Sequence, residues 1–154
     1  MTRGLLFEEF EDGATFVSLA RTVTEADVVA FAGISGDFNP LHTDATFAAE
    51  SPFGQRVAHG MLIAAMATGM ANWIGVFEGT TLALMEQLIQ YKGPVRFGDT
   101  IHLVLTVADK KTTSKPDRGV VIFQTQVVNQ DGQPVLDGRW TLMMRRRVAV
   151  AASA

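Results

Sequence analysis

Residues 60–77, GMLIAAMATGMANWIGVF, form the longest weakly polar stretch of the chain, and the fold has to be built around them. From Met61 to Ile74, apolar residues occupy every face of a helix, interrupted only by Thr68, Asn72 and a glycine. A helix that is apolar on all sides is normally surrounded by protein. The stretch is too interrupted for a membrane span, so it predicts one long, buried helix.

The residues that follow this helix have the period of β-strands. After residue 80, β-branched and apolar residues recur in short runs, separated by turn signals such as Lys92-Gly93-Pro94. About five antiparallel strands are expected, at residues 15–22, 82–91, 100–108, 120–129 and 135–145. The expected fold class is therefore α+β, with a curved antiparallel sheet wrapped around a long central helix.

Capping signals predict two shorter helices before the long one. Thr24 and Asp27 form a capping box, and the helix that follows is expected to stop at Gly33. Asp44 is placed to cap a short second helix. Residues 34–42 are rich in turn formers, so no regular element is expected there.

Length, charge and cysteine content exclude several classes of protein. The chain has 154 residues and no linker-like segment, so residues 1–154 are expected to form a single domain. The formal net charge of −3 has the wrong sign for a typical nucleic-acid-binding protein. The absence of cysteine excludes disulfides, thiolate metal sites and cysteine nucleophiles. The N-terminus lacks the apolar core of a signal peptide, so a cytoplasmic protein with no membrane partner is expected.

The end of the chain has a different character. Arg145-Arg146-Arg147 is a basic run that fits a solvated strand end, and the small residues after it resemble a fraying terminus. A flexible tail is therefore expected from about residue 146 to residue 154.

The segment most informative about chemistry is GDFNPLH, residues 36–42. A tight turn at Asn39-Pro40 would fold Asp37 and His42 onto one side of the chain, whereas an extended loop would separate them. A carboxylate and an imidazole that address adjacent atoms are the groups that general acid–base catalysis requires. The same spacing also fits a structural role, in which Asp37 caps the turn and His42 packs as a hydrogen-bonded polar residue.

Gly60 opens the long helix, where first-turn N–H groups have no partner within the helix and the dipole is positive. Because glycine has no Cβ, a carbonyl oxygen of another molecule can approach this N–H closely. Such a site stabilises a developing oxyanion. The alternative is that Gly60 only permits a tight turn into the helix. His59, just before it, is expected to have a capping or packing role.

Residues 31–62, FAGISGDFNPLHTDATFAAESPFGQRVAHGML, resemble the hydratase motif of the MaoC-like family. This family contains the (R)-specific enoyl-CoA hydratases and dehydratases of the hot dog fold. The resemblance extends to residues 21–27 and 94–100, and therefore covers most of the chain in order. It implies a hot dog domain that interconverts trans-2-enoyl-CoA and (R)-3-hydroxyacyl-CoA, a hydro-lyase reaction.

The resemblance also implies roles for individual residues. Asp37 and His42 are the expected catalytic pair, with Asp37 accepting a proton from water and His42 protonating the α carbon. Asn39 is expected to support the turn between them, and the Gly60 N–H to receive the thioester carbonyl. Candidates for contact with the coenzyme A phosphates are Lys92, Arg96, Lys110, Lys111 and Lys115.

No cofactor is expected, because coenzyme A enters as part of the acyl-CoA substrate. The three histidines are not accompanied by clustered carboxylates in the sequence, so no metal site is expected. Hot dog proteins of this kind pair their sheets edge to edge, and a homodimer or higher homo-oligomer is therefore the expected assembly.

Two alternatives to the hydratase remain open. A hot dog acyl-CoA thioesterase would hydrolyse the thioester, but such enzymes commonly carry a carboxylate on the central helix, and residues 61–74 contain neither Asp nor Glu. A non-catalytic subunit that binds acyl thioesters is the second alternative, and the Asp37 and His42 pair speaks against it.

Overall fold

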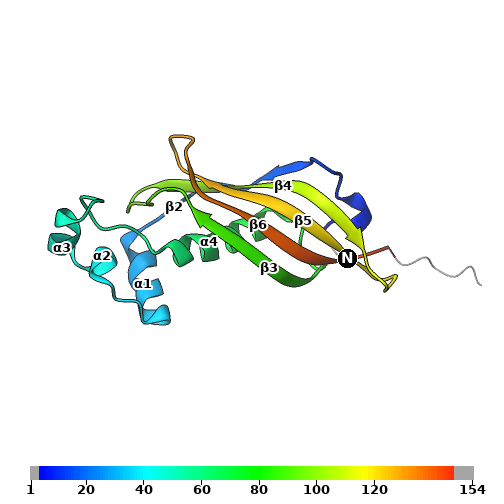
Figure 1. Cartoon of the computed structure of the whole chain (residues 1–154), viewed down its shortest axis with the longest axis horizontal. Coiled ribbons are helices and arrows are strands. Elements are labelled where there is room, and N and C mark those ends of the chain that lie inside the picture. The colour runs from blue at the N-terminus through cyan, green and yellow to red at the C-terminus, as the bar shows by residue number, and fades with distance from the viewer. Residues whose placement is uncertain (1–3, 148–154) are drawn as a thin grey trace, which may run out of the picture.

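The structure, a computed structural model, describes residues 4–147 of the chain. Its strands are β1 (Thr15–Val17), β2 (Arg21–Thr22), β3 (Thr81–Tyr91), β4 (Thr100–Thr112), β5 (Arg118–Val128) and β6 (Pro134–Arg145). They form a six-stranded sheet in the order β1-β4-β5-β6-β3, with β2 also paired to β4, and every pairing is antiparallel. The sheet is open, and β3 forms one of its edges (Figure 1). The expected α+β fold class is confirmed.

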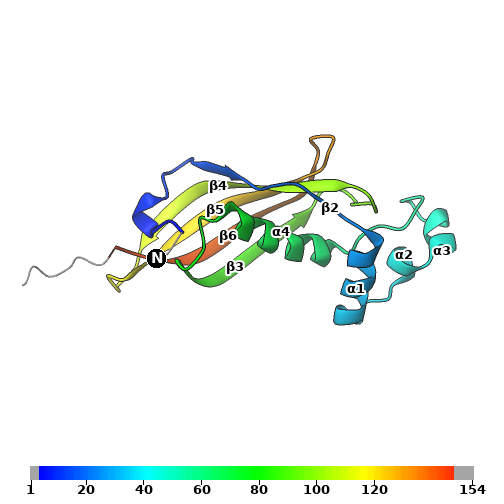
Figure 2. The same ribbon diagram turned by 180° about the vertical axis from the view of Figure 1, so that it is seen from behind.

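The long helix, α4 (Gly60–Ile74), lies along one face of this sheet, as Figure 2 shows. One side of α4 is buried, through Leu62, Ile63, Ala64, Met66, Ala67, Met70 and Ala71. The opposite side is exposed, and it carries Met61, Ala65, Thr68, Gly69, Asn72 and Trp73. The expectation that protein surrounds the helix is therefore wrong for the single chain, because an open sheet covers only one side of it.

The core lies between α4 and the sheet. Side chains facing the helix alternate along the long strands, as in Ile101, Leu103, Leu105 and Val107 of β4, all of which are buried. At the end away from the short helices, Phe10 and Phe77 both meet Phe123 edge to face, with ring centroids 5.5 Å apart.

Two strands differ clearly from their predicted limits, and the limits of the others agree within two residues. The strand expected at residues 15–22 is divided into β1 and β2. Between them, Ser18 stays bonded to Leu103 of β4: its N–H donates to the Leu103 carbonyl and its hydroxyl accepts from the Leu103 N–H, each at 2.9 Å. The strand expected to end at residue 108 continues to Thr112. There the Lys110 ammonium donates to the carbonyl of Phe10 at 2.6 Å, which holds this polar extension in place.

The chain between β2 and α4 leaves the sheet and forms a helical lobe at one end of the molecule (Figure 1). The lobe contains α1 (Glu25–Ser35), α2 (Pro40–Thr43), α3 (Ala45–Glu50) and the loop that leads to α4. The predicted capping box is confirmed: the Thr24 hydroxyl accepts from the Asp27 N–H, and the Asp27 carboxylate accepts from the Thr24 N–H. Asp44 caps α3, as expected.

Two predictions within the lobe are wrong. Helix α1 continues past Gly33 and stops at Gly36, whose φ of 76° is the left-handed conformation that glycine adopts easily. Residues 40–43 form the one-turn helix α2, although no regular element was expected there. Asn39 caps this turn and proline occupies its first position, where a missing N–H costs nothing.

Arg146 and Arg147 are held against the N-terminal segment rather than free in solvent. The Arg146 guanidinium and the Arg147 N–H each donate to the Glu8 carboxylate at 3.0 Å. The rest of the expected tail, residues 148–154, lies outside the described residues. Within residues 4–147, no helix combines the length and the apolar character needed to span a bilayer.

Candidate active site

The turn between α1 and α2 places the two predicted catalytic residues. After Gly36 the chain turns through Asp37 and Asn39, and each side chain accepts a hydrogen bond from the N–H two residues later, at 3.2 Å for Asp37 and 3.0 Å for Asn39. Asn39 thereby starts α2, which carries His42 back toward Asp37. The structure thus brings Asp37 and His42 together, as the spacing predicted.

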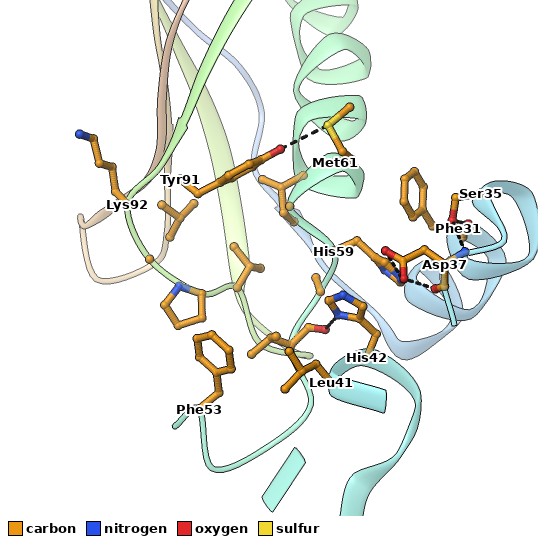
Figure 3. A pocket seen from close by; sticks show the side chains of 18 residues that line it. Phe31, Ser35, Asp37, Leu41, His42, Phe53, His59, Met61, Tyr91 and Lys92 are labelled. Carbon is orange, nitrogen blue, oxygen red and sulfur yellow. Dashed lines mark hydrogen bonds and ion pairs between the residues drawn. The ribbon is translucent and has the colours of Figure 1, made fainter. Parts of the chain in front are cut away.

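His42 is held in one orientation by the backbone. Its Nδ1–H donates to the carbonyl oxygen of Val57 at 2.7 Å, since a carbonyl can only accept. The other ring nitrogen, Nε2, is therefore the one left for proton transfer. The side chains of Asp37, His42 and His59 form a cluster. One carboxylate oxygen of Asp37 and one ring nitrogen of each histidine lie within 4.8 Å of one another. Figure 3 shows these three side chains converging at the start of α4.

Of the two roles expected for His59, capping or packing, the structure shows packing. His59 occupies the N-cap position of α4 but makes no side-chain capping bond. Instead its Nε2–H donates to the backbone carbonyl of Asp37 at 2.8 Å, and its ring lies on that of His42 with centroids 3.7 Å apart. The sequence singles out His59 through its position beside Gly60, but no local pattern links it to His42.

Gly60 is the first residue of α4, as predicted, and its N–H lies at the positive end of a 15-residue helix. A Cβ at this position would lie 2.6 Å from Cε1 of Tyr91, so the ring of Tyr91 packs directly on Gly60. The structure therefore adds a reason for glycine that the sequence did not indicate. Tyr91 ends β3, and its hydroxyl donates to the sulfur of Met61 at 3.3 Å (Figure 3).

A cavity of about 870 Å³ is lined by Asp37, His42, His59, Gly60 and Tyr91, while Asn39 does not line it. Its polar side chains are Ser35, Asp37, His42, His59, Tyr91 and Lys92. The remaining lining is largely apolar, and includes Phe31, Leu41, Phe53, Val57 and Val95. A large apolar cavity with a few convergent polar groups is typical of a small-molecule site.

Among the basic residues considered for phosphate contact, Lys92 is the one that lines this cavity. Its ammonium lies 3.7 Å from the carboxylate of Asp137 and donates to the side-chain oxygen of Gln90 at 3.0 Å. Lys110 instead donates to the Phe10 carbonyl and lies over the ring of Phe7.

Asp37, His42 and His59 are residue types that bind metal ions. No carboxylate was expected to accompany the histidines, and that expectation is wrong, because the fold brings Asp37 next to two of them. However, the His59 Nε2, which lies 4.0 Å from the Asp37 carboxylate, carries the proton that it donates to a backbone carbonyl. That nitrogen is not a free ligand. The expectation of no metal stays a prediction.

A solved structure with a described fold has the same arrangement of sheet and helix. The solved structure of Rv0216 from Mycobacterium tuberculosis is described as having a double hot dog fold. It superposes on this chain at a TM-score of 0.79 with 19% identity, and the match covers all of this chain and 48% of Rv0216. That likeness concerns the fold alone, and it identifies the sheet and helix of this chain as a hot dog domain.

Sequence similarity is more specific. The family model of the MaoC like domain matches residues 10–129. An (R)-specific enoyl-CoA hydratase of Rhodospirillum rubrum is 35% identical over 92% of this chain and 92% of its own length. The crystal structure of a MaoC-like dehydratase from the same organism superposes at a TM-score of 0.82, with 30% identity over 94% of this chain and 99% of that one. The chain belongs to the MaoC-like family.

Proposed function

We propose that this protein interconverts a trans-2-enoyl-CoA and the (R)-3-hydroxyacyl-CoA, with Asp37 and His42 as the acid–base pair. The observation that carries the proposal is the cluster of Asp37 and His42 in one cavity with Gly60 at the N-terminus of α4. The R. rubrum relative is named an (R)-specific enoyl-CoA hydratase, and other curated relatives are also named hydratases or dehydratases. Hydratases and dehydratases of this kind are hydro-lyases, and this chain is therefore a hydro-lyase.

In the hydration direction, the ionised Asp37 accepts a proton from water as the water oxygen bonds to the β carbon. Protonated His42, held through Nδ1 by Val57, delivers the Nε2 proton to the α carbon. The pair is restored when a proton moves from Asp37 to His42, so the net change is the addition of one water. Dehydration uses the same residues in reverse.

Negative charge develops on the thioester oxygen while the β carbon is attacked. The Gly60 N–H, at the positive end of α4, is suited to stabilise that charge because the helix supplies it no carbonyl partner. The apolar lining of the cavity suits an acyl chain.

We also propose that the protein forms a homodimer in the cytoplasm. The support is the free edge at β3 and the apolar side chains exposed beside it, which are Leu82, Leu84, Met85 and Leu88 on β3 and Met61 and Trp73 on α4. An unpaired strand edge next to exposed apolar side chains is normally covered in a native assembly.

The proposed function is tested by incubating the purified protein with crotonyl-CoA. The conjugated double bond is expected to disappear without release of free thiol. Thiol release would indicate a thioesterase, and an unchanged substrate that nevertheless binds would indicate a non-catalytic subunit. Because Asp37 and His42 lie on one turn, addition from a single face is expected. The names of the relatives indicate the R configuration, which chiral analysis of the product should find. Predominantly S product contradicts the assignment.

A further inference from the structure

The buried histidine next to the proposed catalytic pair has no role in the chemistry described so far. The polar residues buried within residues 4–147 are Ser18, His59, Thr80 and Thr125, and His59 is the ionisable one. Its side chain is 2% exposed, although it borders the cavity. Burying an ionisable group costs free energy, so its contacts have to be examined individually.

His59 contacts both members of the pair at once. Its Nε2–H donates to the backbone carbonyl of Asp37 at 2.8 Å, across 22 residues of sequence. Its ring lies over the ring of His42, with centroids 3.7 Å apart and an angle of 30° between the planes. Phe31 of α1 meets the ring of His59 at a centroid distance of 5.0 Å. The ring is thus fixed between α1 and α2, and Figure 3 shows it between Asp37 and His42.

The hydrogen bonds define a neutral ring. Nε2 carries the proton donated to Asp37, while Nδ1 is buried and has no hydrogen-bond partner among the described residues. A second proton on Nδ1 would have no acceptor among the described residues, which is unfavourable, and the group that opposes this effect is the Asp37 carboxylate, 4.0 Å from Nε2. A neutral aromatic ring presents a negative face to His42, and such a face stabilises a neighbouring cation.

We propose that His59 is a positioning residue for the acid–base pair: its N–H holds the Asp37 turn, and its neutral ring supports the protonated form of His42. This inference rests on the proposed function, in which His42 acts as a protonated acid. The other ionisable groups around the cavity are Asp37 on the turn and Tyr91 and Lys92 at the end of β3. Lys92 is paired with Asp137, so two groups lie close to His42: the Asp37 carboxylate, within 4.8 Å, and the His59 ring, which is the one that the substitutions below change.

Two substitutions separate the two contacts. His59→Gln keeps an N–H donor for the Asp37 carbonyl but removes the aromatic face. His59→Phe keeps an aromatic face against His42 but removes the donor. His102→Gln is the matched control, because His102 lies on β4 and does not line the cavity.

The pH dependence of crotonyl-CoA hydration distinguishes the variants. For His59→Gln, the basic limb of the kcat profile should move to lower pH by about 0.5–1 unit, since protonated His42 loses the support of the ring. For His59→Phe, the limb should stay in place while kcat falls by about tenfold and KM stays within about twofold. His102→Gln should match the wild type in both respects.

Imidazole NMR gives a second readout that does not depend on turnover. The chain has only three histidines, so their ring signals can be assigned with the same variants. In the wild type, the His59 ring should carry its proton on Nε2, as its hydrogen bond to the Asp37 carbonyl requires. In His59→Gln, the midpoint of the His42 titration should move in the same direction as the kinetic limb.

The outcomes separate this inference from the proposed function. A wild-type protein that does not hydrate crotonyl-CoA overturns the proposed function. The NMR measurement then tests the contact between His59 and His42 by itself. An active wild type whose His59 variants both keep the wild-type kcat and basic limb overturns the positioning role. A His59 ring that gains a second proton within the titrated range also overturns it.

Discussion

Hydrogen bonds to backbone N–H groups hold the turn that brings Asp37 and His42 together. Substituting the side chain of either residue should therefore change catalysis with little effect on packing. The Asp37 side chain is 53% exposed, and its Oδ1 accepts one N–H, from Asn39. An asparagine at position 37 retains that acceptor but cannot take a proton from water. The proposed roles at these two residues can therefore be tested by conservative substitution.

Asp37→Asn and His42→Ala are each expected to lower the hydration rate by at least about a hundredfold, the lower range for a positioned acid or base. Steady-state kinetics with crotonyl-CoA measures the effect. Because the two residues act as a unit, the double variant should lose far less than the product of the single losses.

Asp44→Asn is the matched control for Asp37→Asn. Asp44 is also an exposed aspartate whose Oδ1 accepts the N–H two residues later, at 2.9 Å, but it caps α3 and does not line the cavity. It should keep near-normal turnover. Near-normal turnover of the Asp37 or His42 variant would remove that residue from the mechanism.

Gly60 and Tyr91 form a second residue-scale test. In Gly60→Ala, the new Cβ meets the Tyr91 ring at 2.6 Å, so the ring has to move. Because Tyr91 is 52% exposed and its ring can turn aside, the loss in the free energy of unfolding should be only about 1 kcal/mol, the lower end for overpacked sites, together with reduced turnover.

A double-mutant cycle with Tyr91→Ala separates the causes. In the Tyr91→Ala background, Gly60→Ala should cost much less stability, because the clash is gone. Turnover should still fall if close approach to the Gly60 N–H matters. If Gly60→Ala proves as stable as the wild type, the packing of Tyr91 on Gly60 is not the constraint described above.

Residues on one short turn could be predicted from the sequence, whereas contacts between distant segments could not. Asp37, Asn39 and His42 are related by turn chemistry, which spacing reports directly. The stacking of His59 on His42 and the packing of Tyr91 on Gly60 depend on how α2, α4 and β3 meet. No periodicity carries that information.

At the scale of elements, α1 is anchored by a charged cap. Burial acts to raise the pKa of the Asp27 carboxyl, but hydrogen bonds from the N–H and hydroxyl of Thr24, together with Arg21, outweigh it. The pKa of Asp27 therefore lies below its ordinary value. At Glu8, burial likewise acts to raise the pKa, and bonds from Arg147 and Arg146 outweigh it.

These shifts predict a loss of stability in acid. A carboxyl whose pKa is lower in the folded state stabilises the protein above its unfolded pKa, and the effect is lost as pH falls through the folded pKa. Denaturant unfolding should therefore show a falling free energy below about pH 5. Asp27→Asn should cost about 1 kcal/mol at pH 7 and make the fall in acid shallower.

Asp12→Asn removes a carboxylate from the loop before β1 and serves as the control for general charge effects. It should leave the free energy of unfolding at pH 7 close to that of the wild type. If Asp27→Asn and the wild type lose stability in parallel as pH falls, the Asp27 cap does not cause the acid sensitivity.

The elements themselves were predictable to different degrees. The long strands and α4 have strong periodicity, and the predicted positions agree with the structure. The end of α1 was misplaced because Gly33 and Gly36 carry the same local signal, and only Gly36 adopts a positive φ. The exposed side of α4 was missed because composition shows that a helix is apolar, not which side the sheet covers.

At the scale of the whole molecule, the open sheet predicts association. Sedimentation at micromolar concentration is expected to find about twice the 16.7 kDa mass of one chain. Met85→Lys and Leu88→Lys place charges on β3, where these side chains are 53% and 49% exposed, and together they should shift the protein toward the monomer.

Leu19→Lys is the control for this substitution, because Leu19 is 74% exposed and lies between β1 and β2, away from the β3 edge. It should leave the mass unchanged. A wild-type protein that sediments as a fully active single chain contradicts the proposed dimer.

The two tryptophans of the chain lie in opposite surroundings, which gives the molecule an optical reporter of its own. Trp140 on β6 is 5% exposed, whereas Trp73, on the uncovered side of α4, is 50% exposed. The emission of an indole depends on the polarity around it, so Trp140 supplies a constant signal and Trp73 one that follows whatever covers α4. Intrinsic fluorescence can thus follow this surface during dilution or ligand addition, without a dye attached to a chain that has no cysteine to carry one.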